Sequence, residues 1–243
     1  MSGVLQNHLA IWQRKPVLRM VYDDFYRRII GASLPGPVLE IGGGIGNLKS
    51  RLADVVSTDI QFARWLSCVA DAQRLPFAAA SFANIVMVDV CHHLEFPIKF
   101  FLEAQRVLQP GGRVIMVEPA ITWGSALFYR CFHEEPVRTA VDPLADGVPD
   151  PARDPYDANQ AIPTLIATRH FRAFHVRVPG LKISRIDWFS LAVYPLSGGM
   201  KRWCLVPAEL ARRALWLERL LEPLVGRLFA FRMMLVIDKV AVP

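Results

Sequence analysis

A strand that runs into a glycine-rich turn constrains this sequence more than any other feature. Residues 38–47 read VLEIGGGIGN, with four glycines inside ten residues. Glycine adopts positive φ and lets the backbone approach a ligand closely, so the segment predicts a ligand-binding turn after a buried strand. The dinucleotide pattern Gly-x-Gly-x-x-Gly is not met, because Asn47 stands at its third glycine. Glu40 would repel a pyrophosphate, and it favours a ligand with a cationic or hydroxyl-rich group.

Short β-branched runs alternate with helix-length segments across residues 37–118. Such alternation predicts βαβ units and a parallel sheet. We expect helices from Leu48 and from Pro97, the second ending at Pro110. The expected strands are residues 38–41, 55–60, 83–90 and 113–118.

The regions that flank residues 37–118 differ from them in composition and in the elements that they predict. Residues 1–36 predict helices broken at Pro16, and the proline-rich, acidic segment 134–157 predicts a long loop. The remaining expected elements are a strand at 182–189, a turn at 194–199, an amphipathic helix at 207–230 and a strand at 233–242.

Composition narrows the class of protein. Hydrophobic residues make up 53% of the 243 residues and charged residues 21%, which excludes wholesale disorder. The four cysteines show no metal-ligand spacing, which predicts a reduced, cytoplasmic compartment. We recognise no secretory signal and no uncharged apolar stretch of about 18 residues. The net charge of +6 permits an anionic partner without requiring one.

Further polar motifs follow the glycine turn in a fixed order. Asp59 ends the second expected strand, where a carboxylate accepts hydrogen bonds from a ribose diol. It is followed by the segments DAQRLPF (71–77), VDVCHHL (88–94) and RVLQPGG (106–112).

Together, these motifs resemble the class I S-adenosylmethionine-dependent methyltransferases, in particular their small-molecule group, which includes quinone methylases (type 11). The resemblance is dense over residues 38–118. It implies a Rossmann-like, doubly wound α/β sheet with strand order 3-2-1-4-5-7-6, strand 7 antiparallel, and S-adenosylmethionine as cofactor. It also implies an N-terminal helical cap (1–36) and a methyltransferase domain (37–243) with acceptor-side insertions at 119–181 and 191–232.

The resemblance also implies roles for individual residues. Asp59 would hold the ribose, Asp71 the adenine amino group, and Asp89 would lie near the sulfonium. The implied cofactor-binding residues are Glu40, Gly42, Gly43, Gly44, Gly46, Asp59, Ile60, Asp71, Ala72, Asp89 and Val90. Only 11 residues separate Asp59 from Asp71, so we expect a short or missing second helix and a third strand reduced to a stub near 68–70.

The acceptor side is less defined. His92 or His93 could act as a base at neutral pH, or could pack or cap a helix. The polar residues His133, Glu134, Asp157, Asn159 and Tyr194 are candidates for substrate contact, or for a structural loop. We predict no metal, because His133 and the two glutamates after it are sequence neighbours that rarely converge on one ion.

The expected helix at 207–230 has two interpretations. Its apolar stripe could pack on the domain, or it could lie on a membrane surface, because Trp216 and several arginines accompany the stripe. Pro223 is expected to kink or split the helix. The stripe consists of Leu210, Ala214, Leu217, Leu221, Leu224 and Leu228, and the arginines are Arg212, Arg213, Arg219 and Arg227.

These patterns favour methyl transfer to a small or lipid-linked acceptor, on oxygen rather than carbon. The enzyme would be cytoplasmic, with peripheral membrane contact if the second interpretation of the helix holds. An RNA or protein methyltransferase, a non-catalytic cofactor-binding scaffold and an unrelated doubly wound domain remain as alternatives. The basic net charge alone gives little support for a nucleic-acid acceptor. Cys91 lacks the Pro-Cys context of a cysteine nucleophile and is interpreted as a packing residue.

Overall fold

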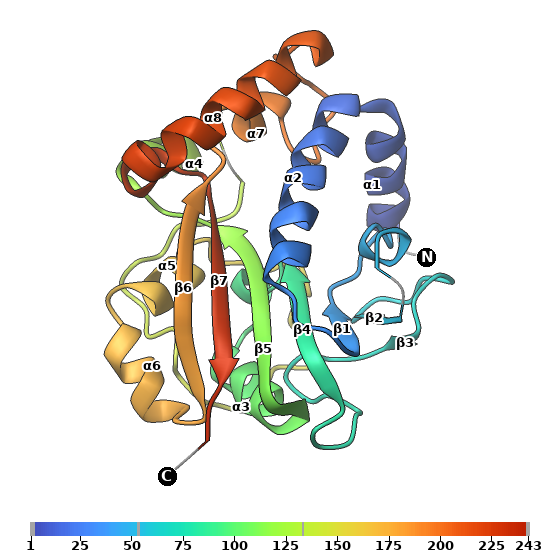
Figure 1. The fold of residues 1–243 in the computed structure, drawn as a ribbon, viewed down its shortest axis with the longest axis vertical. Helices are drawn as coiled ribbons and strands as arrows, with labels where there is room; N and C mark the ends of the chain where they lie inside the picture. Colours follow the sequence, from blue (N-terminus) through green and yellow to red (C-terminus); the bar gives the residue numbers. More distant parts are fainter. Residues whose placement is uncertain (1–2, 53, 133, 242–243) are drawn as a thin grey trace.

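A seven-stranded mixed sheet forms the centre of the molecule (Figure 1). The computed structural model describes residues 3–52, 54–132 and 134–241. The strand order is β3-β2-β1-β4-β5-β7-β6, and β7 runs antiparallel to both of its neighbours, which confirms the predicted topology. The strands are β1 (Val38–Ile41), β2 (Val55–Asp59), β3 (Cys68–Val69), β4 (Phe82–Val88), β5 (Leu108–Pro119), β6 (Leu181–Phe189) and β7 (Arg232–Lys239).

Helices cover both faces of this sheet. Alternating strand residues point to opposite faces, and β5 shows the consequence. Its Val114 and Met116 pack toward one helical layer, and its Ile115 and Val117 pack toward the other. The first layer holds α3 (Pro97–Val107), α5 (Ile162–Ala167) and α6 (Phe171–Arg177); the second holds α1 (Gly3–Arg14), α2 (Pro16–Ala32), α7 (Val193–Ser197) and α8 (Ala208–Phe229).

The helix break at Pro16 is confirmed, and it places a buried lysine at the junction. Lys15 lies between α1 and α2 and is only 6% exposed. Its Nζ donates hydrogen bonds to the carbonyl oxygens of Gly199 and Lys201, at 2.7 and 2.8 Å. The N-terminal helices are therefore tied to the turn that follows α7.

The helix expected from Leu48 is wrong. The chain forms only a single 3-10 turn there, η1 (Leu48–Ser50). Four residues separate this turn from β2, so the connection is too short for a further helix. The other expectation for this region is confirmed, because no helix lies between β2 and β3 in the described chain and β3 has two residues.

The long C-terminal helix also departs from two expectations. α8 is continuous over 22 residues, so Pro223 does not split it. The packing interpretation of its leucine stripe is wrong, because the residues that α8 buries belong to another face of the helix. These buried residues are Ala211, Leu215, Glu218 and Gly226. No described helix is long and apolar enough to span a bilayer.

Glu218 explains how α8 is fixed. Its carboxylate accepts backbone N–H bonds from Leu191, Ala192 and Val193, at 3.0, 2.7 and 2.6 Å. Hydrogen bonds to a charged group contribute about 1.5–3 kcal/mol, and buried donors left without a partner are costly. The helix therefore caps the start of α7.

We expect Glu218→Ala to lower the free energy of unfolding by about 3 kcal/mol, because three N–H groups lose their acceptor. Thermal unfolding followed by circular dichroism measures this. Glu218→Gln keeps one acceptor oxygen and should lose less. Glu209→Ala, on the exposed side of the same helix, should change stability by less than about 0.5 kcal/mol. Equal losses in the two Glu218 variants and the control would contradict the capping role.

Candidate functional site

A cavity of about 540 Å³ lies at the carboxyl ends of β1, β2 and β4. Ligands of open α/β sheets bind at this edge. All the predicted cofactor residues except Gly46 line the cavity, and so do His92, His93, Glu134 and Tyr194. Gly46 does not line the cavity. It packs against Trp65 instead, and a Cβ at Gly46 would lie 2.7 Å from the Trp65 ring.

Two glycines of the turn have no room for a side chain. Gly42 has φ 69°, and a Cβ at this position would lie 2.2 Å from Val90 Cγ2. A Cβ at Gly43 would lie 2.2 Å from Ser57 Oγ. The backbone of the turn thus packs closely against the side chains of Val90 and Ser57, and the same glycines line the cavity.

Asp59 connects β2 to this turn. Its Oδ2 accepts a hydrogen bond from Gly44 N and its Oδ1 one from Gln61 N, both at 2.9 Å. A carboxylate has about four acceptor positions, so Asp59 retains lone pairs for two hydroxyl groups of a ligand. This is the geometry expected of a residue that holds a ribose diol.

Two more carboxylates face the same cavity. Burial raises the pKa of Glu40, opposed by a hydrogen bond that Ser57 donates and reinforced by the charge of Asp59. Asp71 accepts a hydrogen bond from Gln73 N at 2.8 Å, which fixes its orientation. Ile60 lies on the cavity wall with 52% of its surface exposed.

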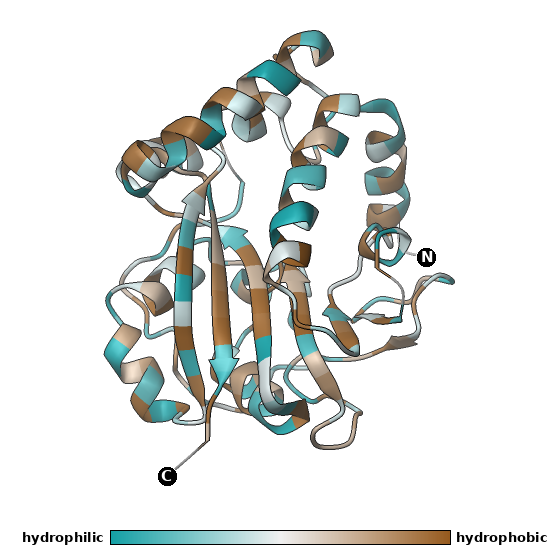
Figure 2. Cartoon of the chain, in the orientation of Figure 1, coloured by the Kyte–Doolittle hydropathy of each residue, from teal (hydrophilic) through white to brown (hydrophobic). Residues whose placement is uncertain are grey.

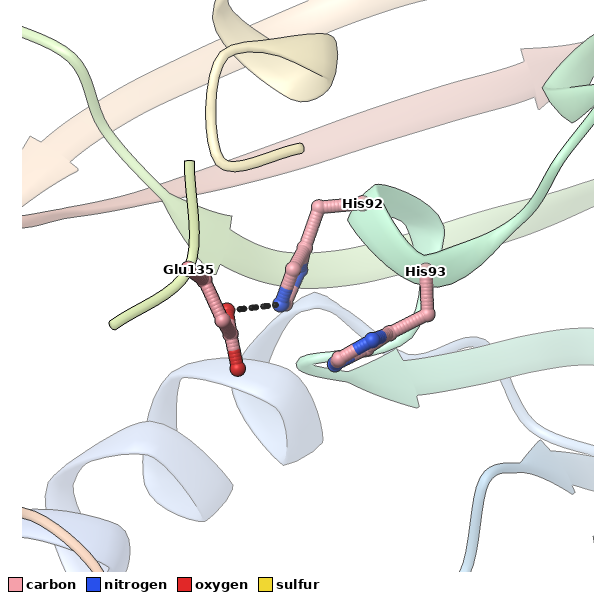
Figure 3. Close-up of side chains that lie close together, drawn as sticks. All are labelled: His92, His93 and Glu135. Carbon is pink, nitrogen blue, oxygen red and sulfur yellow. Dashed lines mark ion pairs between the residues drawn. The ribbon is translucent and has the colours of Figure 1, made fainter. Parts of the chain in front are cut away.

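Two neighbouring histidines stand opposite a glutamate in the cavity wall. His92 and His93 belong to η2 (Cys91–His93), and their rings point toward Glu135 (Figure 3). His92 Nδ1 lies 2.7 Å from Glu118 Oε2, and His92 Nε2 lies 3.5 Å from Glu135 Oε2. Burial lowers the pKa of His92, but Glu118 and Glu135 outweigh it and raise this pKa to about 9. His92 is therefore a cation at neutral pH.

His93 has the opposite character. Burial and the neighbouring His92 cation lower the pKa of His93 below its usual value, so its ring is neutral at pH 7. The ring centroids of the two histidines are 4.2 Å apart. The Nδ1 atom of His93 is buried and has no hydrogen-bond partner within the described part of the chain.

This cluster also has the spacing of a cation site. Ligand atoms of His92, His93 and Glu135 lie within 4.8 Å of one another. However, both ring nitrogens of His92 already face carboxylates, one of them completely buried. We therefore interpret the cluster as a hydrogen-bonded acid–base group.

Sequence reasoning missed Glu118, which holds the cluster in place. It ends β5 in the core and is fully buried. Its Oε1 accepts hydrogen bonds from the backbone N–H groups of Val90 and Cys91, at 2.9 and 2.7 Å. A charged residue at the end of the apolar run 114–117 was the available signal.

Arg232 was missed as well. It begins β7, is 3% exposed, and forms an ion pair with Asp89. Its guanidinium lies 4.2 Å from the centre of the Tyr194 ring and donates a hydrogen bond to the Tyr194 hydroxyl. The Tyr22 hydroxyl lies 3.4 Å from Asp89. This group anchors Asp89, whose backbone has φ 58°, in the cavity wall.

The predicted acceptor residues fall into different places. Glu134 lines the cavity and pairs with Lys201 at 2.8 Å. Its neighbour Glu135 is the one that faces His92, and Gln160 donates a hydrogen bond to it. His133 lies outside the described residues.

Asp157 and Asn159 are not among the described residues that line the cavity. Asn159 instead joins two loop segments, because its side chain exchanges hydrogen bonds of 2.9 Å with the backbone of Arg138. The segment 157–160 thus reaches the cavity through Gln160, which is 2% exposed.

Comparisons with known proteins agree with this geometry. Residues 39–116 match the family model described as a methyltransferase domain. No curated protein matches the chain. A SAM-dependent methyltransferase from Thermotoga maritima, described as a possible histamine N-methyltransferase, is 15% identical with TM-score 0.58, covering 98% of this chain and 100% of that one. A SAM-dependent methyltransferase from Archaeoglobus fulgidus is 16% identical with TM-score 0.51, covering 91% and 94%. At these identities the two structures support the fold.

Proposed function

We propose that this chain, whose residues 39–116 match a methyltransferase domain, is a class I S-adenosylmethionine-dependent methyltransferase that methylates a hydroxyl oxygen of a small or lipid-linked acceptor. The observation that carries the proposal is the position of His93. A neutral imidazole lines the same cavity as the glycine turn and Asp59, beside a fixed cationic histidine. An oxygen acceptor gains from a base that removes its proton during the transfer.

The cavity residues fit the cofactor. The turn at Gly42–Gly44 would accept the methionine portion, because all three glycines line the cavity and place backbone there without side chains. Asp59 would hold the ribose and Asp71 the adenine amino group. When bound, S-adenosylmethionine supplies an electrophilic methyl group whose transfer leaves the neutral thioether S-adenosylhomocysteine.

The protein would contribute position and one proton transfer. With the cofactor bound, His93 would take the hydroxyl proton of the acceptor while the acceptor oxygen takes the methyl group and the electron pair of the broken C–S bond stays on sulfur. His92 would act as a positioning residue, since Glu118 and Glu135 hold its ring. Much of the rate enhancement of such in-line transfers comes from holding donor and acceptor at attack distance.

We expect His93→Gln to reduce the turnover number by about 10²–10⁴ while the affinity for S-adenosylhomocysteine changes less than about threefold. The assay uses methyl-labelled cofactor and host extract, with the organic, aqueous and macromolecular fractions counted separately. His8→Gln is the matched control, because His8 also lines the cavity but from α1. In the wild-type protein, turnover should rise with pH through the lowered pKa of His93 and level off near pH 7.

The alternatives are distinguished by the same assay. Label in RNA or protein would indicate a macromolecular acceptor. Cofactor binding without label in any fraction would favour a non-catalytic scaffold. Full turnover in His93→Gln would show that this histidine is not the base.

A further inference from the structure

The outer face of α8 is covered with leucines that contact no core. Leu217 is 51% exposed, Leu224 79% and Leu228 54%. They follow one another at helical spacing, opposite the side on which Ala211, Leu215 and Gly226 are buried. In Figure 1, α8 lies along the upper edge of the molecule, above the end of β6, and Figure 2 shows hydrophobic segments along it.

Helix α4 (Trp123–Phe132) extends this surface. The Trp123 and Phe229 rings stack edge-to-face with centroids 5.7 Å apart, which joins α4 to the end of α8. We call the combined surface the apolar face, and its exposed members are Leu210, Leu217, Leu220, Leu221, Leu224, Leu228, Phe229, Trp123, Leu127 and Phe132. Contiguous apolar surfaces of this kind mark interaction sites on soluble proteins.

The cavity opens beside the apolar face. Phe132 lines the cavity and is also 70% exposed. Trp203, in the loop between α7 and α8, lines the cavity from another side and is 42% exposed. A ligand that leaves the cavity between these rings therefore meets apolar side chains.

The charges around the apolar face select its partner. Arg212, Arg213 and Arg227 are exposed on α8 and form no ion pair with any described residue, whereas Glu209 is the exposed acid of the helix. Basic residues that flank an apolar helix face match an anionic lipid surface. A second copy of the chain would bring the same arginines toward each other, which disfavours a symmetric dimer through this face.

We propose that the apolar face docks onto an anionic lipid bilayer and opens the cavity toward an acceptor held in that bilayer. The docking itself stands on the surface alone. Only the statement about the acceptor rests on the proposed function. A helix that lies in the bilayer interface needs no membrane-spanning segment.

Flotation of the full chain with phosphatidylcholine vesicles, with and without phosphatidylglycerol, tests the docking. We expect the protein to float with the anionic vesicles. The double variant Leu217→Asp/Leu224→Asp should bind at least about tenfold more weakly, because it replaces two exposed leucines of the apolar face with charged side chains. Arg212→Glu/Arg213→Glu should lose the preference for phosphatidylglycerol.

Val176→Asp is the matched control, because Val176 is 79% exposed on α6, in the layer on the opposite side of the sheet. It should float like the wild-type protein, and thermal unfolding must show that every variant is folded. A wild-type protein that stays in solution, or a double variant that floats equally well, overturns the proposal. So does a dimer in solution that the double variant dissociates.

One further variant and one measurement on the wild-type protein separate docking from the proposed function. His93→Gln should float normally while losing turnover. If the wild-type protein floats but labels only water-soluble metabolites, the docking stands and the lipid-linked acceptor is wrong.

Discussion

Asp59→Ala is expected to weaken binding of S-adenosylhomocysteine by about 10²–10⁴. The variant would lose the two hydrogen bonds that we propose Asp59 accepts from ligand hydroxyls, each worth about 1.5–3 kcal/mol when the acceptor is charged. It also releases Gly44 N from Oδ2, a contact of 2.9 Å that holds the glycine turn against β2. Isothermal titration calorimetry measures the affinity without requiring turnover.

Asp59→Asn provides the graded comparison. Its amide oxygen can still accept one bond, so we expect an intermediate loss. Asp187→Ala, on β6 and outside the cavity lining, serves as the control and should bind normally. Unchanged affinity in Asp59→Ala would show that the cofactor lies elsewhere in the cavity.

Gly42→Ala is expected to abolish detectable cofactor binding and to lower the melting temperature by about 5 °C or more. The new Cβ would lie 2.2 Å from Val90 Cγ2, and the residue would be held at φ 69°. Positive φ costs a non-glycine residue about 1–2 kcal/mol, and each kcal/mol shifts the melting temperature by about 2–4 °C at this chain length. The steric clash adds to this cost.

A substitution at Gly44 measures the effect of backbone strain separately from that of the steric clash. Gly44 has φ 48°, but a Cβ there meets nothing closer than 3.8 Å, so Gly44→Ala should lose only the strain. Combining Gly42→Ala with Val90→Ala should restore part of the stability, because the clashing methyl is removed. Equal stability losses in Gly42→Ala and Gly44→Ala would contradict this account.

The strands could be predicted because each of them is signalled by a short local apolar run. The order of the strands was implied by the resemblance to a known family. The helix expected after Leu48 failed for an equally local reason, because apolar spacing predicts helices without counting the residues needed to return to β2. Four residues do not suffice.

The cofactor side of the cavity was more predictable than the acceptor side. Gly42 and Asp59 belong to one turn and one strand end, which sequence spacing brings together. Glu118, Arg232 and Tyr22 come from separate elements that converge only through the sheet order. Whether Glu134 or Glu135 faces His92 depends on the path of the loop, and the residue pattern of a single sequence does not predict that path.

The helical spacing of α8 could not by itself distinguish packing from exposure. Leu217 and Leu215 both fit a stripe, yet only Leu215 is buried. Which side of α8 is buried depends on polar contacts with distant segments. Glu218 accepts a hydrogen bond from Ala192 N, and Arg219 pairs with Asp24 of α2. Hydrophobic periodicity identifies an amphipathic helix but not its outward side.

The hydrogen bonds of Lys15 connect two segments of the cavity wall. Leu5 and His8 of α1 line the cavity, and so do Gly199 and Lys201 of the turn after α7. Lys15 donates a hydrogen bond to each carbonyl oxygen of these two turn residues. An opening of the cavity between α1 and this turn would therefore break both bonds together.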